Sequence, residues 1–161
     1  MSSARNHWLI KSDVDEFSFA DLQASPGRTA AWDGVRNYEA RNSLRDMRRG
    51  ELVFFYHSGA EPPGIAGIAR VVREAYPDPT QFERGHERFD PRSKPDDPTW
   101  LAVDIRAVEP LPRTVSLDEL KQDPSTAVLR VCQRGSRLSV HPVSEASWLG
   151  VLALTKRKSK P

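Results

Sequence analysis

The sequence has few of the residues and motifs from which many kinds of site are built. One of its 161 residues is cysteine, Cys132, which excludes an internal disulfide framework and a cysteine-based zinc site. No run of 18 apolar residues is present, so no transmembrane helix is predicted. The first eleven residues also lack the apolar segment of a secretory signal. We therefore expect a protein of a reducing compartment with no membrane partner.

Motifs of nucleotide, hydrolase and metal sites are missing too. The chain contains no P-loop, no dinucleotide-binding glycine motif, no serine-hydrolase elbow and no H-E-x-x-H. Acidic residues do gather between residues 75 and 98, but without the spacing of a calcium loop. We expect no cofactor and no bound metal.

Length and charge indicate one domain with a basic tail. A chain of 161 residues is long enough to bury a core as a single unit, which we place at 1–155. The remaining residues, 156–161, carry four positive charges and no acid, and we expect them to be disordered. Without these four charges, 20 basic and 22 acidic groups remain, a net charge of −2. Any contact with nucleic acid must therefore be local.

Hydrophobic periodicity and capping residues predict an α+β fold. We expect a mixed sheet, strongly curved or closed into a barrel, with helices at its ends. In this sheet Gly67 marks a bulge or a close approach. The predicted strands are 7–11, 52–58, 64–74, 100–109 and 138–141. The predicted helices are 19–24, 37–48, one begun by the Ser116–Glu119 capping box, 125–131 and 145–154.

Three further features allow more than one interpretation. Segment 28–36 is predicted as a loop, so Trp32 either offers a stacking platform for a flat ligand or plugs one end of the fold. On the helix 37–48, Arg41 and Arg45 either contact phosphates or form a solvated face. The proline-rich segment 75–98 is either a functional loop or a poorly ordered insertion.

The last helix is expected to turn Trp148, Leu149 and Leu152 inward.

Several long motifs, in order along the chain, resemble the EVE domain. This family belongs to the PUA-like superfamily, to which the YTH and ASCH domains also belong. One departure lies at Ser12-Asp13-Val14, where the family usually has Ser-Glu-Pro. The resemblance covers about residues 7 to 153. The matching segments are HWLIKSDVDEFSFADL (7–22), WDGVRNYEARNSLRDMRRGELVFFYHS (32–58), GIAGIARVVREAYPDPTQF (64–82), SKPDDPTWLAVDI (93–105) and RLSVHPVS (137–144).

The resemblance implies a mixed β pseudo-barrel with peripheral helices and a pocket for a modified base in nucleic acid. Family members are thought to bind modified cytosines in DNA, so methyl-, hydroxymethyl- or formylcytosine is the expected ligand. The phosphate contacts are expected from Arg36, Arg41 and Arg45. Transferred by motif, the base pocket comprises Lys11, Ser12, Trp32, Gly34, Val35, Asn37, Tyr56, His57, Ser58 and Asp78.

The expected function is non-enzymatic binding, in which a flipped base stacks on Trp32. A bare methyl group adds only about 0.8 kcal/mol on burial, so stronger selectivity needs polar groups such as Lys11 and Asn37. Alternatives are an RNA-binding module, an adaptor to a restriction-modification system, and an RNA-processing or hydrolytic enzyme that uses Lys11, His57 and Asp78. The location is expected to be cytoplasmic in a bacterium and nuclear in a eukaryote.

Overall fold

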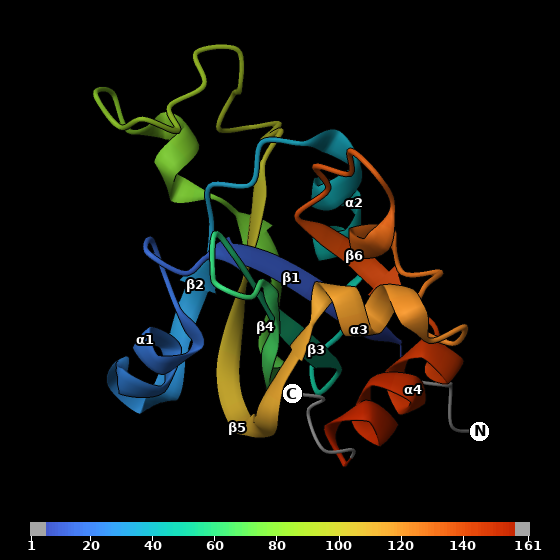
Figure 1. The fold of residues 1–161 in the computed structure, drawn as a ribbon. Helices are drawn as coiled ribbons and strands as arrows, with labels where there is room; N and C mark the ends of the chain where they lie inside the picture. Colours follow the sequence, from blue (N-terminus) through green and yellow to red (C-terminus); the bar gives the residue numbers. More distant parts are fainter. Residues whose placement is uncertain (1–5, 157–161) are drawn as a thin grey trace, which may run out of the picture.

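The computed structural model describes residues 6–156, so the predicted tail beyond Lys156 lies outside the described residues. Figure 1 shows strands and helices intermixed along the chain. The strands are β1 (His7–Asp13), β2 (Thr29–Trp32), β3 (Leu52–Ser58), β4 (Gly64–Pro77), β5 (Leu101–Ser116) and β6 (Val140–Val143). The α-helices are α1 (Phe19–Ala24), α2 (Tyr38–Asp46), α3 (Leu117–Gln122) and α4 (Glu145–Thr155), and the 3₁₀ turns are Pro26–Arg28, Pro79–Phe82 and Arg130–Cys132.

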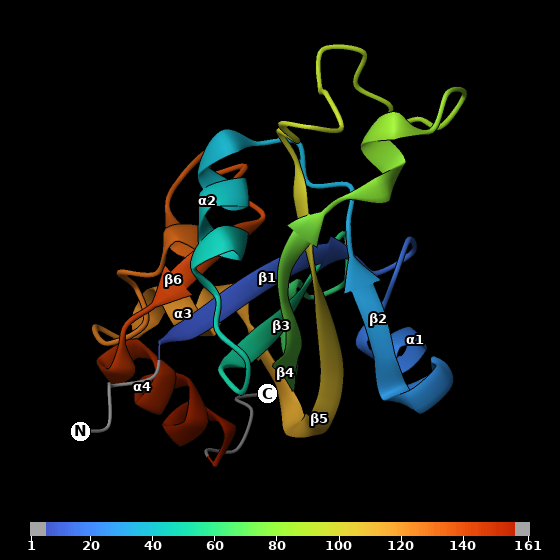
Figure 2. The ribbon, with the colours of Figure 1, turned by 180° about the vertical axis from the view of Figure 1, so that it is seen from behind.

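The strands form a six-stranded mixed sheet in the order β2-β5-β4-β3-β1-β6. The pair β1–β3 is parallel, because α1, β2 and α2 provide the crossover between these strands. The other neighbouring pairs are antiparallel. Figure 2 shows the long strands β4 and β5 side by side, with the short edge strand β2 against β5. The predicted α+β class is confirmed. No helix within residues 6–156 is long and apolar enough to cross a membrane.

Each face of the sheet carries its own hydrophobic core, because successive strand residues point to opposite faces. On one face, Ile10 and Phe55 pack with residues of α1 and α2. On the other face, Leu9 and Phe54 pack with residues of α3 and α4. Alternation along β1 and β3 thus decides which pair of helices covers which face.

Local sequence signals mark two helix starts and one irregularity of the sheet. The predicted capping box of Ser116 with Glu119 is present at the start of α3, and Ser18 with Asp21 forms another at the start of α1. The prediction for Gly67 is also confirmed. The β4–β5 register shifts there, and a Cβ on this residue would lie 2.5 Å from the Phe19 ring. Gly67 therefore makes room for the helix α1 on this face.

Three predictions about local structure are wrong. Residues 29–32, predicted as loop, form strand β2, whose pairing with β5 supplies hydrogen bonds that no local pattern reveals. Residues 125–131 form turns and the start of a 3₁₀ turn rather than a helix, since Ser125 and Thr126 bond locally around Asp123. On α4, Leu149 points outward and is 57% exposed.

His141 is a buried histidine in the sheet and makes stability depend on pH. Its Nδ1 lies 2.9 Å from the carbonyl oxygen of Pro142, and its Nε2 has no hydrogen-bond partner in the described structure. Burial lowers the pKa of His141 below its ordinary value of 6.5. The unfolded chain therefore takes up this proton more readily than the folded chain does. The stabilising contribution is full above about pH 6.5 and is lost as the pH falls through the folded-state pKa.

We expect His141→Leu to flatten the pH dependence of the unfolding free energy below about pH 6.5. Urea unfolding at several pH values measures this slope. Ser147→Ala is the control, because it removes a buried hydroxyl that donates to Ser125 without removing a titrating group. Its loss of stability should be the same at every pH. A His141→Leu variant with the wild-type slope would contradict this assignment.

Candidate nucleic-acid interface

The main cavity lies where the end of β1, the end of β2 and the loop into α2 meet. Its volume is about 940 Å³, at the upper end of the range for ligand sites. Segments far apart in sequence, including 86–88 and 137–139, complete its rim. The lining residues are Lys11, Ser12, Asp13, Glu16, Phe17, Ala30, Ala31, Trp32, Asp33, Gly34, Val35, Arg36, Asn37, His86, Glu87, Arg88, Arg137 and Ser139.

Trp32 ends strand β2 and lines this cavity. Its ring meets Phe55 at 5.5 Å and Phe17 at 6.2 Å between centroids, both in edge-to-face geometry. Strand pairing with Val103 fixes its backbone. Its side chain is half-buried, so part of the indole stays open to the cavity. Trp32 is thus an aromatic surface held in place before any ligand binds.

Asp78 holds the loop that follows Trp32. Its buried carboxylate accepts hydrogen bonds from the Gly34 amide at 2.7 Å and from Arg36 Nη1 at 3.0 Å. It also accepts from the amide and the hydroxyl of Thr80. Burial alone would raise the pKa of Asp78, but these hydrogen bonds outweigh it and hold the pKa below its ordinary value. The carboxylate therefore stays charged and ties the cavity loop to the segment after β4.

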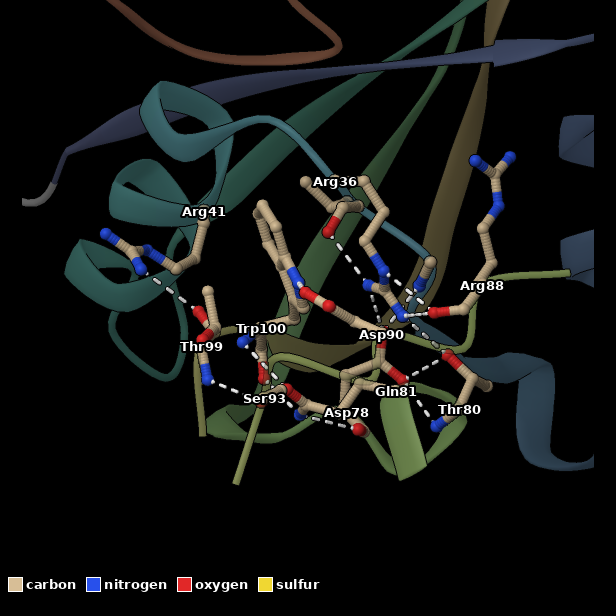
Figure 3. A network of polar contacts seen from close by, with 12 residues as sticks. Arg36, Arg41, Asp78, Thr80, Gln81, Arg88, Asp90, Ser93, Thr99 and Trp100 are labelled. Atoms are coloured by element: carbon tan, nitrogen blue, oxygen red, sulfur yellow. Dashed lines mark hydrogen bonds and ion pairs between the residues drawn. The ribbon is translucent and has the colours of Figure 1, made fainter. Parts of the chain in front are cut away.

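Arg36 completes this tie, as Figure 3 shows. Its guanidinium makes five hydrogen bonds, to the Asp78 carboxylate, the Thr80 hydroxyl and the carbonyl oxygens of Val35 and Arg88. A guanidinium has five N–H donors, so these bonds take up its whole donor capacity. Arg36 is predicted to contact phosphate. In the structure its guanidinium supports the cavity rim through these hydrogen bonds.

The buried side-chain amide of Gln81 holds the proline-rich segment in place by hydrogen bonds. The Gln81 amide nitrogen donates to the carbonyl oxygens of Asp78 and Trp100, and its oxygen accepts from Ser93 and the Trp100 amide. Trp100 in turn lies under the Arg36 guanidinium at 5.4 Å and donates to Asp90 at 2.7 Å. The interpretation as a poorly ordered insertion is thus wrong for this part of the segment (Figure 3).

Lys11 and Asp33 are two charged groups of the cavity without a side-chain partner among residues 6–156. No hydrogen bond or ion pair engages the Lys11 ammonium there, and the Asp33 carboxylate meets only its own backbone amide. Desolvation lowers the pKa of Lys11. Desolvation and the nearby charge of Asp78 raise the pKa of Asp33, although solvent still reaches its side chain. Lys11 therefore offers a cationic donor and Asp33 a carboxylate to a ligand that enters the cavity.

The structure gathers part of the predicted site in the cavity. Six residues from the predicted base pocket line it, together with Arg36: Lys11, Ser12, Trp32, Gly34, Val35 and Asn37. Two of these use their side-chain oxygens locally, Ser12 by donating to the Phe17 carbonyl and Asn37 by capping α2.

The other predicted site residues do not line the cavity. Tyr56 faces the opposite core, because strand alternation turns it toward Leu9 and Trp148. His57 Nε2 accepts from the Phe19 amide at 2.9 Å, and burial lowers its pKa. Ser58 lies at the end of β3, paired with Asp13.

Two arginines predicted to contact phosphate are also engaged within the protein. Arg41 donates to the carbonyl oxygen of Thr99 at 3.0 Å and to Asn42, and it lies over the Tyr38 ring at 5.1 Å. Arg45 donates to the same Asn42 oxygen at 3.0 Å. Asn42 thus holds these two side chains against α2.

Sequence reasoning missed Asp33, Arg88 and Arg137 as cavity residues. Asp33 lies in the segment 28–36 that is predicted as a loop, between the predicted pocket residues Trp32 and Gly34. Arg88 comes from the proline-rich segment, and Arg137 begins one of the motifs that carried the family resemblance. No local pattern could join these segments, because tertiary packing alone brings 33, 88 and 137 to one rim.

The chain belongs to the EVE domain family. The model of that family matches residues 6–154. The chain is 41% identical to human thymocyte nuclear protein 1 over an alignment of 174 positions. The alignment covers 98% of this chain and 77% of that protein.

Solved structures agree with this assignment. The crystal structure of human THYN1 protein in complex with 5-methylcytosine-containing DNA superimposes with a TM-score of 0.90 at 41% identity, covering 96% of this chain and 99% of that one. The YTH domain of the MRB1 protein from Zygosaccharomyces rouxii has a TM-score of 0.54 at 15% identity, over 99% and 90% of the two chains. This second likeness concerns the fold alone.

Proposed function

We propose that this protein binds DNA without catalysis and reads a modified cytosine in the main cavity. The observation that carries this proposal is the cavity itself, which combines the rigidly held indole of Trp32 with the ammonium of Lys11 and the carboxylate of Asp33. The human THYN1 protein, similar over nearly the whole chain, is described in complex with 5-methylcytosine-containing DNA. That similarity supports methylcytosine in DNA as the first ligand to test.

The free groups suit the polar edge of cytosine. Cytosine offers an N4 amino donor, and carboxylates accept from it. Asp33 supplies such a carboxylate at the cavity wall. Cytosine also has the acceptors N3 and O2, which suit the ammonium of Lys11. Both protein groups become paired only when a base enters, so a base without this pattern leaves a charged group unpaired at a cost.

The free-energy terms for entry of a base are of similar size. Flipping a base out of the duplex costs a few kcal/mol, and stacking on one aromatic ring returns about 1–3 kcal/mol. A buried methyl group adds about 0.8 kcal/mol, roughly a fourfold preference. Hydroxymethyl or formyl groups add a polar atom that Lys11 can bind. We therefore propose that the preference for these bases is at least as large as that for methylcytosine.

The catalytic alternative needs Lys11, His57 and Asp78 to converge on one substrate. Lys11 lines the cavity, but His57 and Asp78 do not. His57 accepts from the backbone of α1, and Asp78 is paired with Arg36. These bonds occupy the groups that an acid–base mechanism would use, which favours binding over catalysis.

Fluorescence anisotropy with matched duplexes tests the proposal. The duplexes carry one central cytosine that is plain, methylated, hydroxymethylated or formylated, and a matched RNA set is run beside them. We expect several-fold tighter binding of a modified DNA duplex. We expect Asp33→Ala to weaken that binding about tenfold or more, since a hydrogen bond to a charged group is worth ~1.5–3 kcal/mol.

Asp15→Ala is the matched control for charge, because Asp15 is an exposed acid that lies outside the cavity lining. It should leave the preference unchanged. Equal affinity for all the DNA duplexes would overturn the proposal. A preference seen only with modified RNA would move the function to the RNA-binding alternative.

A further inference from the structure

A second, smaller cavity adjoins the first and is rich in arginine. Its volume is about 370 Å³. It lies between the start of α2 and the segment before β6. The lining residues are Asn37, Glu39, Arg130, Gln133, Arg134, Gly135, Ser136, Arg137 and Leu138.

The two cavities share part of their lining. Asn37 and Arg137 line both. A nucleotide whose base occupies the first cavity therefore places a neighbouring part of its strand against the second. The shared lining gives the second cavity a defined position next to the base.

The charge of the second cavity is positive and available. Arg130 is paired with Glu39 at 2.7 Å, and Glu39 is the one acid in the lining. Arg134 and Arg137 are exposed, and neither guanidinium has a hydrogen bond or ion pair within residues 6–156. Two free guanidinium groups remain, and their planar forks match phosphate oxygens.

The segment that carries these arginines is anchored at both ends. Cys132 and Leu138 are buried on either side of it. Between them the Ser136 amide donates to the Gln133 carbonyl, and Gly135 adopts a positive φ of 73° that closes the turn. The turn therefore presents Arg134 and Arg137 on a short exposed ridge rather than on a long flexible loop.

The arginines before and on α2 are engaged within the protein. The guanidinium of Arg36 has all its donors bonded, and Arg41 and Arg45 each donate to Asn42. We propose that the second cavity, through Arg134 and Arg137, binds the DNA phosphate backbone next to the recognised base. This inference rests on the proposed function and assigns the backbone contact to the turn 133–137 instead of helix α2.

Salt titration of DNA binding tests this assignment. The double variant R134Q/R137Q is compared with wild type on plain and methylcytosine duplexes between about 50 and 200 mM salt. We expect the slope of log K against log salt to become shallower by about two, since each lost phosphate contact removes roughly 0.9. The single variant R134Q should keep the wild-type ratio of modified to plain affinity, because Arg134 lines only the second cavity, whereas Arg137 also lines the first.

The control is R70Q/R106Q, which removes two exposed arginines of β4 and β5 that line neither cavity. It carries the same change of net charge and should keep the wild-type slope. An R134Q/R137Q slope equal to that of the control would overturn the assignment. A normal loss of slope without any modified-base preference in wild type would leave the backbone site standing and overturn the proposed function instead.

Discussion

Trp32→Ala is expected to erase the preference for modified cytosine and to weaken binding of the modified duplex by roughly five- to 150-fold. The loss corresponds to the ~1–3 kcal/mol that one base–aromatic stack contributes. The effect is large because the indole is already fixed by Phe17 and Phe55, so stacking costs no rearrangement of the ring. Anisotropy titration of the methylated and plain duplexes measures both quantities.

Two further variants separate stacking from folding. Trp32→Phe keeps an aromatic face and should retain part of the preference. Tyr38→Ala removes an aromatic ring that is 62% exposed and lies outside both cavity linings. It should leave the preference intact. If Trp32→Ala is folded by thermal melting and still discriminates like wild type, the base does not stack on this ring.

Asp78→Ala is expected to have the largest effect on stability, a loss of about 3–5 kcal/mol. Removing one partner of a buried ion pair leaves the other charge uncompensated. Here Arg36 would lose its carboxylate, and the Gly34 amide and Thr80 would lose their acceptor. Denaturant unfolding measures the change. DNA affinity should fall as well, because the loop from Gly34 to Asn37 forms part of the cavity wall.

Neighbouring substitutions define what Asp78 contributes. Asp78→Asn keeps an acceptor oxygen but removes the charge, so its loss of stability should be smaller than that of Asp78→Ala. Asp96→Ala removes an exposed acid of the same segment and should change stability by about 0.5 kcal/mol or less. An Asp78→Ala variant as stable as Asp96→Ala would show that the Arg36–Asp78 pair does not hold the rim.

Much of the fold follows from local sequence signals. A nearly continuous apolar run predicts strand β3, and apolar residues at a period of 3.6 predict helix α2, where Ala40, Leu44 and Met47 are fully buried. Capping boxes marked the starts of α1 and α3, because side-chain oxygens there bind the free amides of the first turn. Family motifs pointed to Trp32 and Lys11, and the structure places both in one cavity.

Other features of the site depend on contacts between distant residues. Strand β2 exists because β5 offers it a partner that lies far away along the chain, as in the pair Ala30–Ile105, and short strands have little intrinsic stability. The sequence could not show that the Arg36 guanidinium donates its hydrogen bonds to Asp78, Thr80 and Arg88. An arginine looks the same in sequence whether it binds phosphate or supports a loop.

The sequence by itself thus determined the family, the class of fold, most helices and strands, and the residues Trp32 and Lys11 of the cavity. These follow from periodicity, capping and motifs, which act over a few residues. The tertiary structure alone decided which arginines are free, which face Tyr56 occupies and how Asp33 and Arg137 come to one rim. The physical reason is that a side chain's availability depends on its partners, and a partner such as Asp78 lies 42 residues from Arg36 in the chain.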